Sequence, residues 1–317
     1  MATAVFASCS NEDGLPQSNY PMDNVVRIMT SVDGMNTRAS YGNSADKLKS
    51  FGFCIKNANS EKYTYDNIKV SQKGYNWIPA TQMLWQNSTT AVDILAYAPY
   101  QETTEDANGK VKVFGKTDYA FSVKEDQSNA EDYSSDLIVF KQTGFTPVSE
   151  LNTSKAVEVA FTHLLSQLNL IIELRDQFNT NNNTVTKGFV TDVKVNGTII
   201  SSKVDFSASP ISVQVDGTQT AAITPETTGF TPAENATAHA VFNYSAIVIP
   251  QTVAAGNFSI SFKVNNTEYI WTATDAVTFE SGKKHELHLL AGKDVVQGGA
   301  ISAKPWGKET ITEKETD

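Results

Sequence analysis

The chain has 317 residues, which is enough for one large domain or two ordinary ones, each with a core of its own. Its hydrophobic content of 40% and its charged content of 19% are typical of a soluble globular protein with few surface charges. The formal net charge, 25 − 35 = −10, argues against nucleic acids and anionic membrane surfaces as electrostatic partners.

The first residues predict a lipid attachment site. Small residues precede Cys9 in the run Ala4-Val-Phe-Ala-Ser-Cys9, and acidic residues follow it, as in bacterial lipoproteins. Cys9 would carry the lipid, and residues 1–22 would be a signal remnant and a flexible tether, so that the protein reaches the membrane only through the lipid. The apolar run before Cys9 is too short for the core of a signal peptide, so we expect a truncated signal; a chance match is the alternative. For the second cysteine, Cys54, we expect a half-buried thiol rather than a disulfide.

A strand is predicted directly after this tether. Residues 23–32 show the period of two that is typical of a half-buried strand. The residues expected to face inward are Val26, Ile28, Thr30 and Val32. Asp33-Gly34 is a turn signal, and the polar, small-residue stretch up to Lys49 predicts an exposed loop around Arg38.

Arg38 is the expected cleavage site in that loop. The arginines of the chain are Arg27, Arg38 and Arg175, so an arginine-specific protease would find few targets. Cleavage between Arg38 and Ala39 would separate the strand from the rest of the chain. We hypothesise that the strand is a removable placeholder; the alternative is an ordinary edge strand followed by a loop that contains an arginine.

The rest of the chain is a series of short strand patterns separated by turn signals. Residues 92–99 form a continuous apolar run suited to a central strand, and Asn196-Gly197 and Asp216-Gly217 are hairpin signals. Later strands are expected at 156–163, 164–174, 240–249, 257–264, 268–273 and 284–290. Thr143–Ser154 is rich in Gly, Pro, Thr and Ser, so we place a boundary there and divide the chain into domains at 23–148 and 149–317. The pattern predicts an all-β fold with two β-sandwiches in tandem.

The sequence motifs of catalytic and metal chemistry are absent. The chain contains no G-x-G-x-x-G, P-loop, G-x-S-x-G, H-E-x-x-H or C-x-x-C motif. His285 and His288 are three residues apart, so in a strand they would point to opposite faces and would not bind one ion together. Four residues offer oxygen ligands for calcium, with solvated loop charge as the alternative; they are Asp126, Asn129, Glu131 and Asp132. We therefore predict no enzyme, no cofactor and no metal site.

Short motifs spread over nearly the whole chain match, in order and spacing, those of a known family. They are Ala7-Ser8-Cys9, Thr37-Arg38-Ala39, Trp77-Ile-Pro79, Val92–Pro99, Asp136–Val139, Val157–Leu168, Ala246–Thr252, Ser281–Leu287 and Trp306-Gly307. Each is weak alone, but together they resemble the fimbrillin (type V pilin) family of Gram-negative anaerobes.

The resemblance implies a fold, an export route and a mode of assembly. The fold would be two transthyretin-like β-sandwich domains, in an outer-membrane lipoprotein that a gingipain-like protease cleaves after an arginine. Loss of the first strand would leave a groove for the C-terminal strand of another pilin subunit, of the same or a different kind, by β-augmentation. At ~1.5–3 kcal/mol per buried aliphatic side chain, refilling the groove is worth on the order of 5–9 kcal/mol before ordering costs. The protein would then be a structural subunit of a type V pilus with a role in adhesion to a host protein or glycan.

Two points stay open in the sequence. The best donor-strand candidate, Asp294–Ile301, is interrupted by Gly298-Gly299, and it would be the last strand of the second domain if the protein is a tip or anchor component. The alternative function is a surface-anchored binding module that does not polymerise, in which Tyr75, Trp77 and Trp85 stack on sugars rather than pack in the core. A secreted hydrolase is a distant third.

Overall fold

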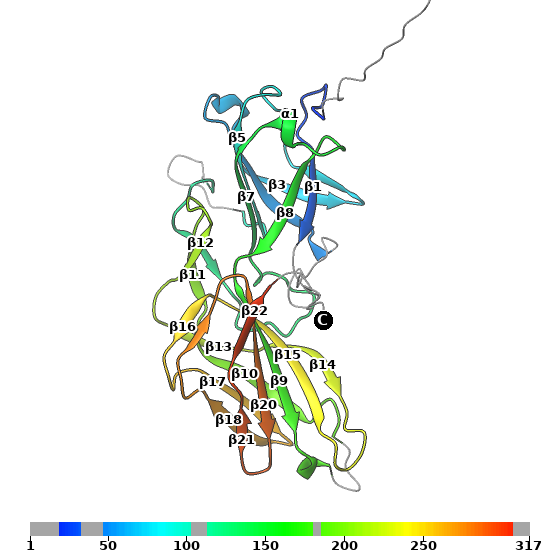
Figure 1. The fold of residues 1–317 in the computed structure, drawn as a ribbon, viewed down its shortest axis with the longest axis vertical. Helices are drawn as coiled ribbons and strands as arrows, with labels where there is room; N and C mark the ends of the chain where they lie inside the picture. Colours follow the sequence, from blue (N-terminus) through cyan, green and yellow to red (C-terminus); the bar gives the residue numbers. More distant parts are fainter. Residues whose placement is uncertain (1–18, 33–46, 103–112, 180–184, 307–317) are drawn as a thin grey trace, which may run out of the picture.

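The computed structural model describes residues 19–32, 47–102, 113–179 and 185–306, and within them the chain is almost entirely β (Figure 1). This confirms the predicted fold class. One short α-helix, α1 (Pro147–Glu150), and two 3-10 turns, Glu61–Tyr63 and Asp176–Phe178, complete the regular structure of these residues.

A seven-stranded sheet forms the upper part of the molecule in Figure 1. Its strands, in spatial order, are β1 (Ile28–Val32), β8 (Val157–His163), β7 (Ile138–Phe145), β5 (Val92–Ala98), β2 (Ser50–Lys56), β3 (Tyr65–Lys73) and β4 (Asn76–Pro79). The apolar run at 92–99 is the central strand β5, as predicted, and its residues are buried because both faces of the sheet are covered.

The lower part of the molecule contains a six-stranded sheet and a four-stranded sheet that pack together. The six-stranded sheet consists of β14 (Glu226–Thr231), β15 (Ala240–Val248), β9 (Ser166–Leu174), β20 (Lys283–Ala291) and β21 (Val296–Gly298), with β22 (Ser302–Pro305) also paired to β20. The four-stranded sheet consists of β13 (Thr220–Ile223), β10 (Val190–Ile199), β17 (Ser259–Val264) and β18 (Thr267–Thr272).

Two small sheets complete the fold. One consists of β12 (Ser212–Val215), β11 (Ser201–Asp205) and β6 (Tyr119–Ser122), and the other of β16 (Gln251–Val253) and β19 (Val277–Phe279). The three-stranded sheet joins chain segments far apart in sequence, because β7, β8, β9 and β10 lie between β6 and β11 in the chain. Lys141 of β7 strengthens this junction by donating hydrogen bonds to the carbonyls of residues 206, 207 and 208, at 2.8–2.9 Å.

Buried side chains form two clusters, and the seven-stranded sheet contributes to both. One of its faces carries Phe51 and Phe161 into a smaller core. Its opposite face carries Cys54, Leu95 and Tyr97 into a larger core that continues between the six- and four-stranded sheets. Cys54 is therefore fully buried rather than half-buried, and this burial raises the pKa of its thiol well above the ordinary value.

The division of the chain at 148/149 stays a prediction. The expected boundary stretch contains α1, after which β8 returns to the seven-stranded sheet and pairs with both β1 and β7. We propose that β8 belongs with the first domain and that a boundary is better placed after His163.

Both hairpin expectations were wrong. Asp216-Gly217 joins β12 to β13, but β12 pairs with β11 and β13 pairs with β10 in a different sheet. Asn196-Gly197 does not form a hairpin but lies inside β10, where the pairing with β13 shifts register between Val195 and Thr198. Gly197 has a φ of 91°, and a Cβ there would lie 1.9 Å from the Asn257 carbonyl oxygen. The glycine thus permits a bulge with close backbone approach rather than a tight turn.

Candidate functional site

The predicted first strand is β1, and it lies at one edge of the seven-stranded sheet. It pairs in parallel with β8 over five register positions, from Ile28 opposite Val157 to Val32 opposite Phe161. Val26, Ile28 and Val32 are 2%, 6% and 4% exposed, whereas Met29 is 47% exposed, so the predicted alternation is present. Thr30 is partly buried. The apolar side chains of this strand are part of the smaller core.

The residues before β1 hold the start of the strand to a neighbouring loop. The Val26 amide donates to the Met83 carbonyl at 3.0 Å, and the Trp85 amide donates to the Asn24 carbonyl at 2.8 Å. Arg27 forms an exposed ion pair with Asp23 at 2.6 Å. Hydrogen bonding from Arg27 lowers the pKa of the Asp23 carboxyl to about 2.

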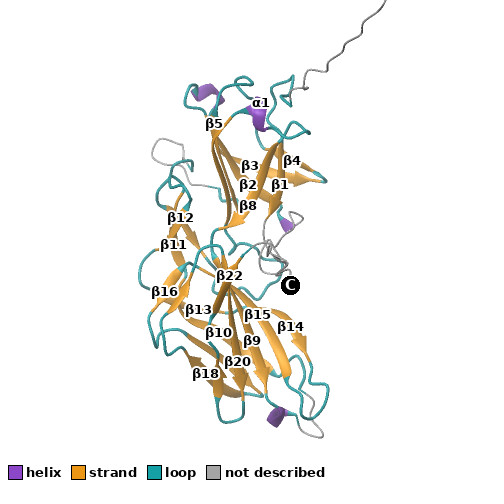
Figure 2. Cartoon of the chain, in the orientation of Figure 1, coloured by secondary structure: helices purple, strands orange, loops and turns teal. Residues whose placement is uncertain are grey.

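A groove of about 700 Å³ runs between β1 and β4. These strands are the two ends of the seven-stranded order, so the sheet curls until its edges face each other across the groove (Figure 2). Its lining residues include Met29, Trp77, Ile78 and Met83. Within the described residues β1 pairs as a strand with β8 alone, so its other edge borders this groove, as an open sheet edge would for an added strand.

The remaining predicted site residues are not part of the described structure. Cys9, Arg38 and Ala39 all lie outside the described residues, and β1 ends at Val32, directly before the stretch that contains Arg38. Lipidation and cleavage at these positions stay predictions.

The donor-strand candidate lies at the edge of the six-stranded sheet. Residues 296–298 form β21 and residues 302–305 form β22, and both run antiparallel along β20. A Cβ on Gly298 would lie 2.2 Å from Trp271 Nε1, so the glycine lets the Trp271 ring pack against the strand. In the single chain the donor-strand candidate is thus part of the six-stranded sheet.

The three aromatic residues of the sugar-binding alternative do not form one surface: Tyr75 and Trp77 both line the groove, whereas Trp85 does not. Trp85 is 2% exposed and stacks on Phe145 with ring centroids 5.6 Å apart. Trp77 is partly buried and packs edge-on against Phe51, whereas Tyr75 is fully exposed. Core packing accounts for Trp85 and contributes to the placement of Trp77.

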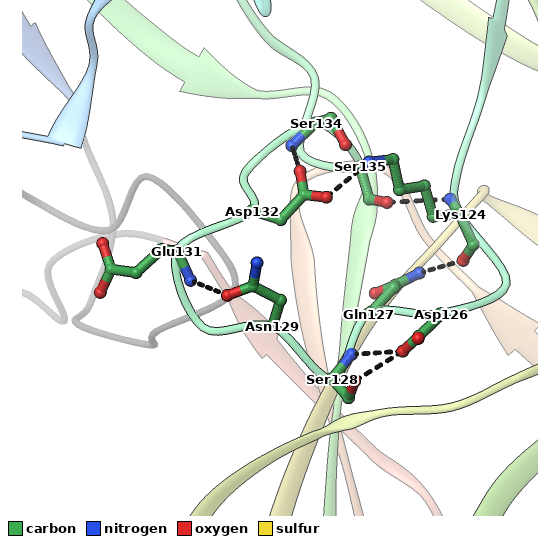
Figure 3. Close-up of polar contacts among 9 residues, drawn as sticks. All are labelled: Lys124, Asp126, Gln127, Ser128, Asn129, Glu131, Asp132, Ser134 and Ser135. Carbon is green, nitrogen blue, oxygen red and sulfur yellow. Dashed lines mark hydrogen bonds and ion pairs between the residues drawn. The ribbon is translucent and has the colours of Figure 1, made fainter.

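The acidic loop does not gather its oxygens around one point (Figure 3). Asp126 accepts hydrogen bonds from the backbone and hydroxyl of Ser128, and Asp132 accepts from the Ser134 amide and from Lys124. Asn129 accepts from the amide of Glu131, whose own carboxylate points away. Asp126, Asn129 and Asp132 thus each close a local turn, and the Glu131 carboxylate accepts from the Tyr133 hydroxyl instead. Among the described residues, no group of three or more His, Cys, Asp or Glu side chains is arranged so that it could hold a metal ion.

A cluster of polar residues that sequence reasoning missed lies on the six-stranded sheet. Glu173 of β9 contacts His239, just before β15, and lies 2.6 Å from His288 Nε2 of β20. Burial works to raise the pKa of Glu173, but hydrogen bonds from the two histidines outweigh it, so this pKa is below its ordinary value. The three residues meet because β15, β9 and β20 are neighbours, and no sequence motif encodes that order.

None of the helices in the described part of the chain has the length and apolar character needed to cross a membrane.

Comparison with known proteins gives a family and a set of structures with a similar fold. A family model described as fimbrillin-like matches residues 37–306, a stretch that begins after β1 and one residue before Arg38. A search of curated protein sequences gives no match.

Three solved structures resemble the chain over most of its length. A protein assigned to cell adhesion from Bacteroides uniformis is 19% identical, with 90% of this chain and 99% of that chain covered and a TM-score of 0.58. A second such protein, from Bacteroides ovatus, is 14% identical, with 90% and 98% covered and a TM-score of 0.61. A fimbrial protein from Bacteroides vulgatus is 17% identical, with 89% and 99% covered and a TM-score of 0.52. At these identities the likeness shows a shared fold.

Proposed function

The chain belongs to the fimbrillin-like family, and on this premise we propose that it is a structural subunit of a cell-surface fimbria. In this proposal an arginine-specific protease cuts after Arg38, β1 leaves, and a strand from another subunit takes its place. Cys9 carries a lipid that holds the protein at the outer membrane before or during assembly.

The position of β1 is the observation that carries the proposal. It is an edge strand with one partner strand, and it begins beside an open groove. It also supplies aliphatic side chains to a core that would otherwise be open at that edge. A replaceable strand requires both properties, because one-sided pairing lets it leave and buried side chains make refilling of its position favourable.

The energetics favour replacement over an empty site. Loss of β1 would uncover the positions of Val26, Ile28 and Val32 together with the paired edge of β8. At ~1.5–3 kcal/mol for each aliphatic side chain, refilling these positions is worth on the order of 5–9 kcal/mol before ordering costs. An incoming strand with apolar residues at every second position would recover the burial and the hydrogen-bond ladder together.

Digestion of the intact protein tests the proposal. After treatment with an arginine-specific protease we expect a new N-terminus at Ala39, and then a ladder of multimers on denaturing gels of unheated samples. An Arg38→Lys variant is the matched control and should stay monomeric. A first cut after Arg27 or Arg175, or a protein that stays monomeric once β1 is lost, would contradict the proposal.

A peptide of residues 24–33 sharpens the same test. It should compete with self-association of the cleaved protein because it restores the original strand. The peptide with Ile28→Asp should not compete, since it would place an unpaired charge in the core. Equal competition by both peptides would mean that they do not bind in the position of β1.

The lipid anchor has a separate test. With a complete signal in place, Cys9→Ala should move the protein out of the membrane fraction, and Cys54→Ala should leave it there because Cys54 is buried. Membrane association that survives Cys9→Ala would remove the lipid from the proposal and leave the strand exchange untouched.

A further inference from the structure

The C-terminal end of β22 is fixed by one buried aromatic residue. Trp306 is 6% exposed, and its ring stacks on that of His163 with centroids 3.8 Å apart and an interplanar angle of 4°. Its amide donates to the Gly282 carbonyl at 2.9 Å, and Lys284 Nζ lies 6.0 Å from the ring centroid. Trp306 is thus held from two sides and through its backbone.

His163 belongs to the other part of the molecule. It is the last residue of β8, and its Nδ1 lies 2.9 Å from Oδ1 of Asp136, two residues before β7. Both side chains are completely buried. As a carboxylate Asp136 only accepts, so the imidazole donates and its ring plane is fixed. The Trp306 contact therefore ties the C-terminal edge of the six-stranded sheet to the seven-stranded sheet.

The chain before Trp306 is held much more weakly. Of residues 293–306, Trp306 alone is buried, while Val296 and Ile301 are partly buried and the rest are exposed. The ladder to β20 is split into three register positions for β21 and four for β22. Such a segment opens at low cost once its anchor is lost.

The anchor itself depends on stacking rather than on side-chain hydrogen bonds of the tryptophan. Trp306 Nε1 and His163 Nε2 are both buried without a hydrogen-bond partner among the described residues. Opening returns both nitrogens to water, which offsets part of the lost stacking and burial. The Trp306–His163 contact can therefore hold the C-terminal segment on β20 and still release it.

Strand β8 connects this anchor to β1. Five register positions pair β8 with β1, from Val157 to Phe161, whereas only Thr162 and His163 pair with β7. After loss of β1, the backbone pairing left to β8 would be its short ladder with β7, at the end of β8 that contains His163. The strand that positions the anchor is thus held largely by the strand that we propose to be removed.

We propose that Trp306, seated on the His163–Asp136 pair, is a latch that keeps the C-terminal segment 294–306 on β20 and loosens when β1 is lost. Its role in assembly rests on the proposed function, because the latch would withhold the donor segment until the acceptor groove has formed. The latch contact and its link to β1 are properties of the monomer and are testable without any polymer.

Backbone hydrogen exchange of the intact monomer tests the latch. Trp306→Ala should speed amide exchange of residues 302–304 of β22, whose last residue is a proline without an amide hydrogen, at least about tenfold, a change that corresponds to loss of about 1.4 kcal/mol of local stability. Exchange in β9 and β15 should not change. Lys304→Ala, which removes an exposed side chain of β22, should have no effect, and Trp306→Phe should be intermediate. Unchanged exchange at 302–304, or faster exchange throughout the molecule, would overturn the latch, since Trp306 would be either dispensable or a general core residue.

The link to β1 is tested in the same experiment without protease. Ile28→Ala, which loosens β1, should speed exchange at 302–304, and Met29→Ala, on the exposed face, should not. Equal exchange in these two variants would overturn the link.

Assembly then separates the latch from the proposed function. After cleavage at Arg38, Trp306→Phe should polymerise several-fold faster than the unsubstituted protein. If the exchange effects appear but no variant polymerises, the latch stands and the fimbrial subunit proposal fails. If both proteins polymerise at the same rate, the latch does not regulate assembly.

Discussion

The two edge segments of the molecule are held in contrasting ways. Strand β1 has five unbroken register positions and spreads its burial over several aliphatic side chains. The C-terminal segment has two short ladders separated by a break, and a single tryptophan supplies its deep burial. We therefore expect the edge with distributed burial to leave only if the chain is cut, and the edge with one anchor to open reversibly.

The largest expected effect comes from a charge placed in β1, the edge strand whose burial is spread over several side chains. Ile28→Asp would bury an unpaired carboxylate among aliphatic neighbours, so the free energy of unfolding of the seven-stranded sheet should fall by at least about 3 kcal/mol. Urea titration followed by tryptophan fluorescence would measure it. Met29→Asp, one residue along and on the exposed face, should cost less than about 1 kcal/mol. Equal losses in the two variants would mean that β1 is not seated as the structure places it.

A smaller effect on local stability is expected in the C-terminal segment, when a side chain is added at one of its glycines. In Gly298→Ala the new Cβ would meet the Trp271 ring, which Phe258 contacts edge-on, so the segment should lose about 1–3 kcal/mol of local stability. Hydrogen exchange of residues 296–298 would report the loss. Gly299→Ala is the matched control, since the atom nearest to its Cβ is 4.0 Å away. Similar exchange in both variants would contradict the close packing of Trp271 on β21.

How far the sequence predicted these edges depends on the range of the interactions. The period of two places Val26, Ile28 and Val32 on one face of β1 because alternation is a local property of a strand. The parallel pairing of β1 with β8 joins residues about 130 positions apart, and no local signal specifies such a partner. The same limit hid the Trp306–His163 contact, although both residues lie within motifs that the sequence made visible.

Glycines were the second source of error, for a physical reason. The sequence predicts a turn at Asn196-Gly197, but this pair lies inside β10; it also predicts a break at Gly298-Gly299, which does separate β21 from β22. A glycine serves equally well in a turn, a bulge or a close approach, and the neighbour across the sheet decides which. For Gly197 that neighbour is the Asn257 backbone, and for Gly298 it is Trp271.

The smallest expected effect depends on pH and lies at Glu173 of β9, which contacts His288 of β20, the strand to which the C-terminal segment pairs. The folded-state pKa of Glu173 is below its ordinary value, so Glu173 stabilises the fold above the unfolded pKa and loses this contribution as pH falls through the lowered folded pKa. Because the side chains of His239 and His288 are partly exposed, the gain should be below about 1 kcal/mol. Thermal melts from pH 6 downward should fall less steeply for Glu173→Gln than for the unsubstituted protein, with Glu286→Gln, on the exposed side of β20, as the control. Matching slopes for Glu173→Gln and the unsubstituted protein would mean that the contacts of Glu173 do not favour its charged form. The cluster of Glu173, His239 and His288 joins β15, β9 and β20. Glu173→Gln should therefore shift the melt of the six-stranded sheet without changing hydrogen exchange in β1 or in the C-terminal segment. This result would separate the stability of the six-stranded sheet from that of the two edge segments.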